Sequence, residues 1–134
     1  MISKFHDFLL SVDSDFRHPI SSKVNLMEYA HKLSENAYVF SAINGNKIIG
    51  LVALYCNDPL RERAYIPFVA VDKQHRGQHI SKSLMFSAIA YAKGNGFYTL
   101  GVHTENPVAL NLYLSLGFKL IEDGERKYLE LPLN

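Results

Sequence analysis

The amino-acid sequence predicts one mixed α/β domain of the α+β kind, residues 1–134, in which about four helices flank a mostly antiparallel sheet. Two hairpins predict the antiparallel pairing, because Asn44-Gly45 and Asp123-Gly124 lie between β-rich runs and favour tight turns. Between the hairpins, a strand-like run at 64–71, a helical run from Ile80 and a strand-like run at 97–103 predict a parallel crossover. A chain of 134 residues can bury one core.

Two helices are expected before the first hairpin. Residues 3–11 can bury Phe5 and Phe8 on one face, and residues 23–35 place apolar side chains at three- and four-residue spacing, with Ser21 or Ser22 available as N-cap. The run 48–55 that follows is apolar almost without alternation, which is typical of a strand covered on both faces. We therefore expect this run inside the sheet.

Two later segments contain residues that restrict the backbone. Pro67 lies within the strand expected at 64–71, and because proline lacks a backbone donor, this strand should be bulged or splayed from a neighbour there. Farther on, Asn106 suits an N-cap, Pro107 the first helical position and Gly117 the residue after the helix end. A short helix between Asn106 and Gly117 is therefore expected.

Charge and cysteine content exclude several kinds of function. Lys and Arg number 14 against 13 Asp and Glu, a net charge of +1, so no broad basic field is present and we expect no nucleic-acid partner. Cys56 is the single cysteine, which rules out an internal disulfide and favours a reducing, cytoplasmic location. The apolar part of the N-terminal segment is too short and too polar for a signal sequence or a membrane span, so we expect no association with a membrane. The histidines show no metal-ligand spacing, so we expect no bound metal.

The loop "DKQHRGQHIS" between strand 64–71 and the next helix suggests an anion site. Gly77 lets the backbone turn sharply before a helix whose first N–H groups have no internal partner, and Arg76 adds positive charge. Glycine and polar residues also precede many helices for capping reasons alone. The loop by itself therefore leaves phosphate binding and simple capping both open.

Three single residues are open to a structural and a functional interpretation. Tyr113 lies in the middle of the short helix, where its ring could pack against the core or its phenol could donate a proton. Capping explains Asn106 completely. His103 ends a strand where a sheet can open toward a ligand, but lone histidines are more often structural hydrogen-bond partners.

Taken together, two motifs resemble those of the GCN5-related N-acetyltransferase (GNAT) family. The family's acetyl-CoA loop, Q/R-x-x-G-x-G/A after an apolar strand end, is matched by "VAV" at 69–71 followed by "QHRGQH" at 74–79. The later motif N-x-x-A-x-x-x-Y-x-x-x-G-F is matched in full, by "NPVALNLYLSLGF" at 106–118. The resemblance covers nearly all of the chain from about Val24 and implies acetyl-CoA as cosubstrate, with a splayed parallel strand pair in the sheet.

The resemblance also implies roles for individual residues. The pyrophosphate of CoA would bind the loop and the helix start, and the pantetheine arm would pair with the edge of the splayed strand. Asn106 would line the cosubstrate from the other side, and Tyr113 would face its sulfur. The implied cosubstrate-binding residues are Phe68, Val69, Ala70, Val71, Arg76, Gly77, Gln78, His79, Ile80, Ser81, Asn106 and Tyr113.

The implied reaction is direct attack of a primary amine on the acetyl thioester. The Val69 amide would stabilise the oxyanion, and Tyr113 would protonate the departing thiolate, because a phenol and a thiol are close in pKa. Many relatives place a glutamate base on the strand that corresponds to 64–71, but this strand has none. The general base stays open among four residues near the expected cleft and a water relay; the residues are Asp58, Glu62, Tyr65 and His103.

Two departures from the family pattern concern the loop, where His79 replaces a small residue and Ser81 a frequent glycine. The resemblance implies a small amine as acceptor. The segments 16–35 and 57–63, which choose the acceptor in the family, carry charges of both signs. The N-terminal half weakly resembles members that acetylate nucleotide-linked amino sugars, so such a sugar is one form of the expected acceptor. Alternatives are a protein or peptide N-acetyltransferase and a non-catalytic acyl-CoA sensor or assembly module. The apolar terminal strands could pair across a homodimer.

Overall fold

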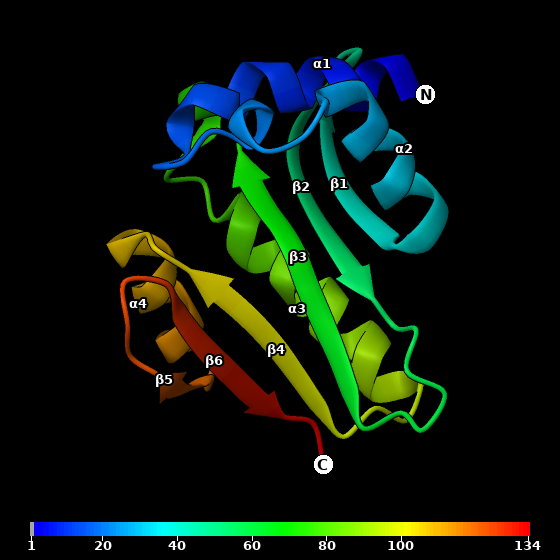
Figure 1. The fold of residues 1–134 in the computed structure, drawn as a ribbon, viewed down its shortest axis with the longest axis vertical. Helices are drawn as coiled ribbons and strands as arrows, with labels where there is room; N and C mark the ends of the chain where they lie inside the picture. Colours follow the sequence, from blue (N-terminus) through cyan, green and yellow to red (C-terminus); the bar gives the residue numbers. More distant parts are fainter. Residues whose placement is uncertain (1) are drawn as a thin grey trace.

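A six-stranded sheet with helices on both faces organises the chain in the computed structural model, which describes residues 2–134 (Figure 1). The helices are α1 (Ile2–Val12), α2 (Leu26–Asn36), α3 (Ile80–Gly94) and α4 (Pro107–Ser115), with short 3-10 turns at Asp13–Asp15, Ile20–Ser22 and Lys73–His75. The strands are β1 (Tyr38–Asn44), β2 (Lys47–Tyr55), β3 (Arg63–Val71), β4 (Thr99–Thr104), β5 (Lys119–Glu122) and β6 (Lys127–Pro132). Their order is β1-β2-β3-β4-β6-β5, and only β3 and β4 pair in parallel.

Most of the expected elements are confirmed, with one error at a helix start. Gly45 adopts φ +62° in the β1–β2 turn, and β2 is buried along most of its length between β1 and β3. Asn106 caps α4 by accepting hydrogen bonds from the first backbone amides of that helix. The prediction of Ser21 or Ser22 as the cap of α2 is wrong: Asn25 caps it, and the Ser21 hydroxyl instead donates to Asp13 at 2.6 Å. Asparagine directly before the apolar run satisfies the cap better than serines several residues upstream.

The irregularity expected at Pro67 is present on both sides of β3, as a loss of pairing toward β4 and as a bulge toward β2. Toward β4, the parallel register ends at Ile66 opposite Val102, so no rung includes the five residues from Pro67 to Val71. Toward β2, the register moves from Ala53 opposite Phe68 to Tyr55 opposite Tyr65. Two β3 residues therefore face one β2 residue, which is a bulge.

The bulge changes which face of the sheet each β3 side chain covers. Before it, Ala64 and Ile66 belong to the core beneath α3 and α4. After it, Phe68 belongs to the separate core beneath α1 and α2, where its ring lies 5.7–6.5 Å from those of Phe8, Phe16 and Tyr29. A single strand thus joins the two hydrophobic cores of the chain.

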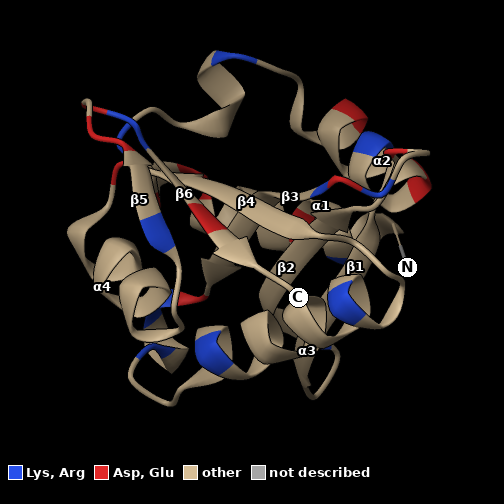
Figure 2. Cartoon of the chain, turned by 90° about the horizontal axis from the view of Figure 1, so that it is seen from below, with Lys and Arg blue, Asp and Glu red and all other residues tan. Residues whose placement is uncertain are grey.

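Lys and Arg as well as Asp and Glu occur along most of the described chain, whereas the charged residues of α3 are lysines only (Figure 2). Among residues 2–134, no helix combines the length and the apolar character needed to cross a bilayer.

We predict that Gly50→Ala destabilises the fold, because a Cβ at Gly50 would lie 2.7 Å from Ile80 and 3.3 Å from Leu84, both on α3. The expected loss is about 1–3 kcal/mol in the free energy of unfolding, the usual range for overpacking. Urea denaturation followed by circular dichroism measures it. The matched control is Gly94→Ala in α3, where a Cβ meets no atom within 4 Å and stability should stay equal or rise by up to about 1 kcal/mol. Equal midpoints for Gly50→Ala and the parent chain would contradict the close approach of α3 to β2.

Candidate active site

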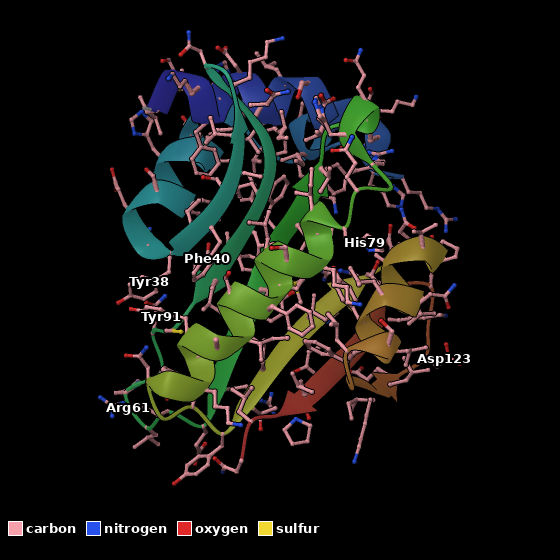
Figure 3. All side chains as sticks on the ribbon, turned by 180° about the vertical axis from the view of Figure 1, so that it is seen from behind. Tyr38, Phe40, Arg61, His79, Tyr91 and Asp123 are labelled. Atoms are coloured by element: carbon pink, nitrogen blue, oxygen red, sulfur yellow. The ribbon has the colours of Figure 1, made fainter. Side chains whose placement is uncertain are left out.

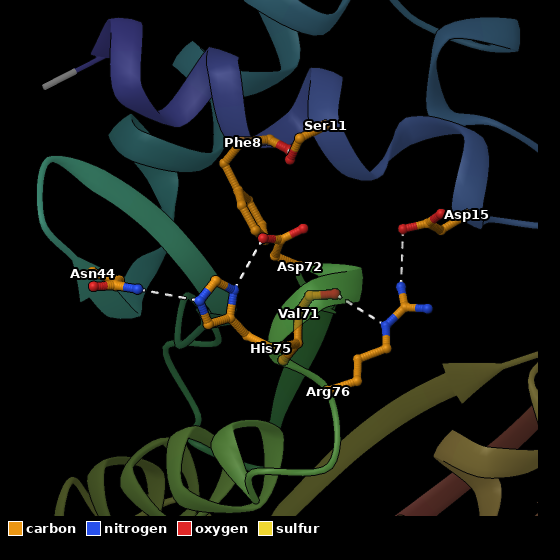
Figure 4. A network of polar contacts seen from close by, with 8 residues as sticks. All are labelled: Phe8, Ser11, Asp15, Asn44, Val71, Asp72, His75 and Arg76. Atoms are coloured by element: carbon orange, nitrogen blue, oxygen red, sulfur yellow. Dashed lines mark hydrogen bonds and ion pairs between the residues drawn. The ribbon is translucent and has the colours of Figure 1, made fainter.

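The loop between β3 and α3 is fixed at its start by a chain of hydrogen bonds (Figure 4). The Asp72 amide donates to the Ile49 carbonyl at 2.7 Å, which continues the β2–β3 pairing by one residue. The Asp72 carboxylate lies 3.0 Å from His75 Nδ1, and His75 Nε2 lies 3.2 Å from the Asn44 side-chain amide. The β1–β2 hairpin therefore holds the loop in place.

The exposed Arg76 side chain forms two intramolecular contacts. Its Nε donates to the Val71 carbonyl at 3.2 Å, and its Nη2 forms an ion pair with Asp15 at 2.9 Å (Figure 4). The guanidinium thus ties the loop to the 3-10 turn after α1. The Arg76 side chain remains 48% exposed, so its guanidinium is also accessible to a ligand in the loop.

The start of α3 offers a row of free backbone donors. Gly77 has φ +83°, and His79, which precedes the helix, has φ +60° and ψ +23°, the left-handed conformation. The first internal bond of α3 runs from the Ser83 amide to the His79 carbonyl. Within the described chain, no side chain caps α3 and the amides of residues 77–82 have no hydrogen-bond partner. Unpaired amides at the positive end of a helix dipole form an anion site.

The His79 side chain makes no cap hydrogen bond to α3. It is exposed and lines an open hollow of about 540 Å³ together with Lys82, Ser83, Phe86 and Ser87, all on α3 (Figure 3). Ser81 is half-buried at the helix start.

The expected cosubstrate edge, Phe68 to Val71, offers backbone rather than side chains. Phe68 is buried in the aromatic cluster beneath α1 and α2, and Val69 packs partly against the α3 core. On the β4 side this segment has no register partner, because the parallel pairing ends at Ile66. The geometry leaves main-chain groups of this stretch available for an extended ligand.

Tyr113 lies on the α3 and α4 side of the sheet, in the larger core, with its ring 5.7 Å from that of Phe118. The residue is 2% exposed. No hydrogen bond of its hydroxyl is found among residues 2–134, yet the hydroxyl is not sealed from solvent. Burial, and secondarily the neighbouring Tyr65 phenol, raises the pKa of Tyr113 well above its ordinary value. The phenol thus stays protonated at neutral pH, and the raised pKa makes it a weaker acid toward a thiolate than a free phenol.

Asn106 is exposed at the start of α4, and its side-chain oxygen accepts from Val108 N at 2.8 Å and Ala109 N at 3.3 Å. The oxygen is therefore committed to the cap. The side-chain NH₂ group is the part of Asn106 that remains for a ligand.

The opposite face of the sheet carries a polar pair that the sequence did not reveal. Tyr65 on β3 and His103 on β4 are joined by a hydrogen bond between the phenol oxygen and Nδ1, 2.7 Å long. Alternation predicts that the two residues share a face, but not that their side chains meet across the last rungs before the splay. Asp58, another base candidate, instead accepts backbone N–H bonds from Leu60, Glu62 and Arg63.

Comparison with known proteins gives matches over most of the chain. The model of the acetyltransferase (GNAT) family matches residues 5–118. Human N-acetyltransferase 8B is 41% identical over 78 residues, 54% of this chain and 34% of the relative, and N-alpha-acetyltransferase 30 of Schizosaccharomyces pombe is 28% identical over 129 residues, 92% and 83%. The chain spans 34–44% of the length of the first three curated relatives that it matches.

Solved structures share the fold. A GNAT-family acetyltransferase from Staphylococcus aureus Mu50 superposes with a TM-score of 0.79 at 19% identity, covering 99% of this chain and 93% of that chain. An aminoglycoside 6'-N-acetyltransferase complexed with coenzyme A superposes with a TM-score of 0.78 at 10% identity, covering 99% and 91%. With the family model matching most of its length, the chain belongs to the GNAT family of acetyltransferases.

Proposed function

We propose that this chain transfers an acetyl group from acetyl-CoA to a primary amine of a small molecule. The observation that carries the proposal is the continuity between two features: the uncapped amides of residues 77–82 and the unpaired β4-side edge of β3 from Pro67 to Val71. The amides suit a pyrophosphate and the edge suits an amide-containing arm. Structures of fold relatives, described as complexes with coenzyme A and acetyl coenzyme A, support the choice of cosubstrate.

Each end of the site has a proposed task. Residues 77–82 hold the phosphates, and Phe68 to Val71 hold the arm, with the Val69 amide as the donor to the oxyanion. Acetyl-CoA supplies the activated acetyl group as a thioester. Tyr113 protonates the departing thiolate, since its hydroxyl is protonated, unpartnered and on the α4 side of the opening between β3 and β4.

A second candidate is acetylation of a protein or peptide N-terminus. It is favoured by the 28% identity over 129 residues to N-alpha-acetyltransferase 30 of S. pombe, 83% of which is covered. Small amines, including a nucleotide-linked amino sugar, are favoured by charges of both signs in the segments 16–35 and 57–63. An acceptor screen monitored by thiol release separates the two, using spermidine, kanamycin, an amino-sugar nucleotide and a short peptide with a free N-terminus.

The first prediction of this function concerns CoA binding. Gly77→Ala should weaken CoA binding about 5- to 30-fold in calorimetry, because φ +83° costs an L-residue about 1–2 kcal/mol and the free loop can relax away from it. The matched control is Gly45→Ala, which carries the same kind of strain in the β1–β2 turn. Gly45→Ala should leave CoA affinity unchanged. Equal affinities for all three chains, or no CoA binding by the parent chain, would overturn the assignment of the loop.

The second prediction concerns the proposed acid. Tyr113→Phe should lower turnover by roughly ten- to a thousandfold while CoA affinity changes little, since only a proton donor is removed. Tyr98→Phe, at an exposed tyrosine outside the site, is the control and should keep parental turnover. Because the raised pKa keeps Tyr113 protonated, the alkaline loss of activity in the parent chain should lie above about pH 10, the ordinary range of a phenol. A binding-only module would bind CoA and release no thiol with any acceptor.

A further inference from the structure

The structure assigns the base of the proposed reaction: we propose that Tyr65 and His103 act as one proton-accepting unit for the acceptor amine. The inference rests on the proposed function and deepens it. Its basis is the 2.7 Å hydrogen bond between the Tyr65 hydroxyl and His103 Nδ1 at the point where β3 and β4 separate. Nothing in the sequence pattern distinguishes this pair from the other base candidates.

The pair lies on the face of the sheet away from Tyr113. On β3, Ala64 and Ile66 face the core beneath α3 and α4, and on β4 Leu100 and Val102 do the same. Tyr65 and His103 alternate with these residues and therefore face the other side. Over β4 and β6 this side is free of helices within the described chain (Figure 1). The Tyr65–His103 pair therefore lies on a sheet face that no described helix covers at β4 and β6, opposite to the α4 phenol.

The position along the strands places the pair at the opening itself. Tyr65 is opposite Gly101, one rung before the last rung at Ile66 and Val102, and His103 is the first β4 residue beyond it. Gly101 has no side chain, and the Tyr128 hydroxyl fills the space above it. The Tyr65 phenol also lies near enough to Tyr113 to raise the pKa of the latter.

The proton transfer is balanced. The lone pair of the neutral amine forms the N–C bond to the acetyl carbon, which makes the nitrogen strongly acidic. Its N–H proton passes to the Tyr65 oxygen while the Tyr65 proton passes to His103 Nδ1. The C–S bond breaks, and the thiolate takes the proton of Tyr113. His103 then loses its proton to solvent, Tyr113 regains one, and both groups return to their starting states.

The charges around His103 keep it ready to accept a proton. Burial lowers its pKa, the Arg126 guanidinium lowers it further, and Glu122 on β5 opposes them. From β6, the Tyr128 ring lies 4.7 Å from the imidazole, centroid to centroid. Burial raises the pKa of Tyr65 against the opposing effect of Arg126. A protonated phenol therefore faces a neutral imidazole at pH 7, and the proposal uses the tautomer in which Nδ1 accepts from the Tyr65 hydroxyl.

The other two residues considered as bases lack this arrangement. The Asp58 carboxylate accepts hydrogen bonds from three backbone amides at the entry to β3, so its role is to hold the loop between β2 and β3. Glu62 is exposed just before β3, at the end where β3 and β4 are still paired. Neither carboxylate lies at the separation of the strands.

Steady-state kinetics of variants at both residues test whether Tyr65 and His103 act together as the base. In His103→Asn the amide keeps a hydrogen-bond acceptor near the Nδ1 position but cannot take a proton. We expect kcat/KM for the best acceptor of the screen to fall about 100-fold, the acid limb of its pH profile to disappear, and CoA affinity to stay unchanged. Tyr65→Phe should cause a similar loss, and the double variant should lose little more than either single one, because the two residues act together. His6→Asn on α1 is the control and should match the parent chain.

NMR titration of the histidines tests the same proposal without an acceptor. His103 should titrate below about pH 6.5, and Arg126→Met, which removes the positive charge, should raise that pKa. The acid limb of kcat/KM should move to higher pH in the same variant, which a purely structural role would not produce. If no acceptor reacts, slow thiol release to water replaces the acceptor assay.

The outcomes separate the two levels of the proposal. No CoA binding and no thiol release by the parent chain would overturn the proposed function itself. CoA binding and turnover that survive in His103→Asn with an intact acid limb would overturn the base alone. Additive losses in the double variant, or a His103 pKa at or above the ordinary value, would also exclude a shared proton relay.

Discussion

The end of hydrogen bonding between β3 and β4 is the constraint on which the rest of the structure depends. Pro67 has no backbone N–H, so β3 cannot keep a regular ladder with both neighbours at this point. The strand responds with a bulge toward β2 and a loss of pairing toward β4. Both effects lie at or directly beside Pro67: the bulge reverses the faces, and the lost pairing separates the two strands.

The reversal of faces explains how a small domain builds two environments around one opening. Because Ile66 points beneath α3 and Phe68 points beneath α1, the strand is anchored on both sides of the bulge. A strand held this firmly can leave main-chain groups unpaired without being drawn into the neighbouring strand. Tyr113 and the Tyr65–His103 pair then lie on opposite faces of the sheet, as the proposed entry of two substrates from different sides requires.

The sequence predicted the fold closely because its signals are local. The turn at Gly45, the cap at Asn106 and the break at Pro67 each follow from the backbone properties of one residue, and each is confirmed. The hydrogen bond between Tyr65 and His103 could not be predicted in this way. The two residues are 38 positions apart in the chain, and their contact depends on where their two strands diverge. The ion pair between Arg76 and Asp15 is non-local for the same reason.

The start of α3 is the clearest place where local stability is given up. Asn25 caps α2 and Asn106 caps α4, whereas α3 begins after His79, a left-handed residue whose side chain makes no cap. A missing cap costs about 1 kcal/mol and a left-handed non-glycine residue about 1–2 kcal/mol more. Hydrogen bonds at Asp72 and His75 and the Arg76 ion pair hold the loop in this unfavourable geometry. Local strain that the surrounding contacts maintain is typical of binding sites, and here its effect is to keep six consecutive amides, 77–82, unpaired in the absence of a ligand. An anion that accepts from those amides would supply the cap that the sequence omits.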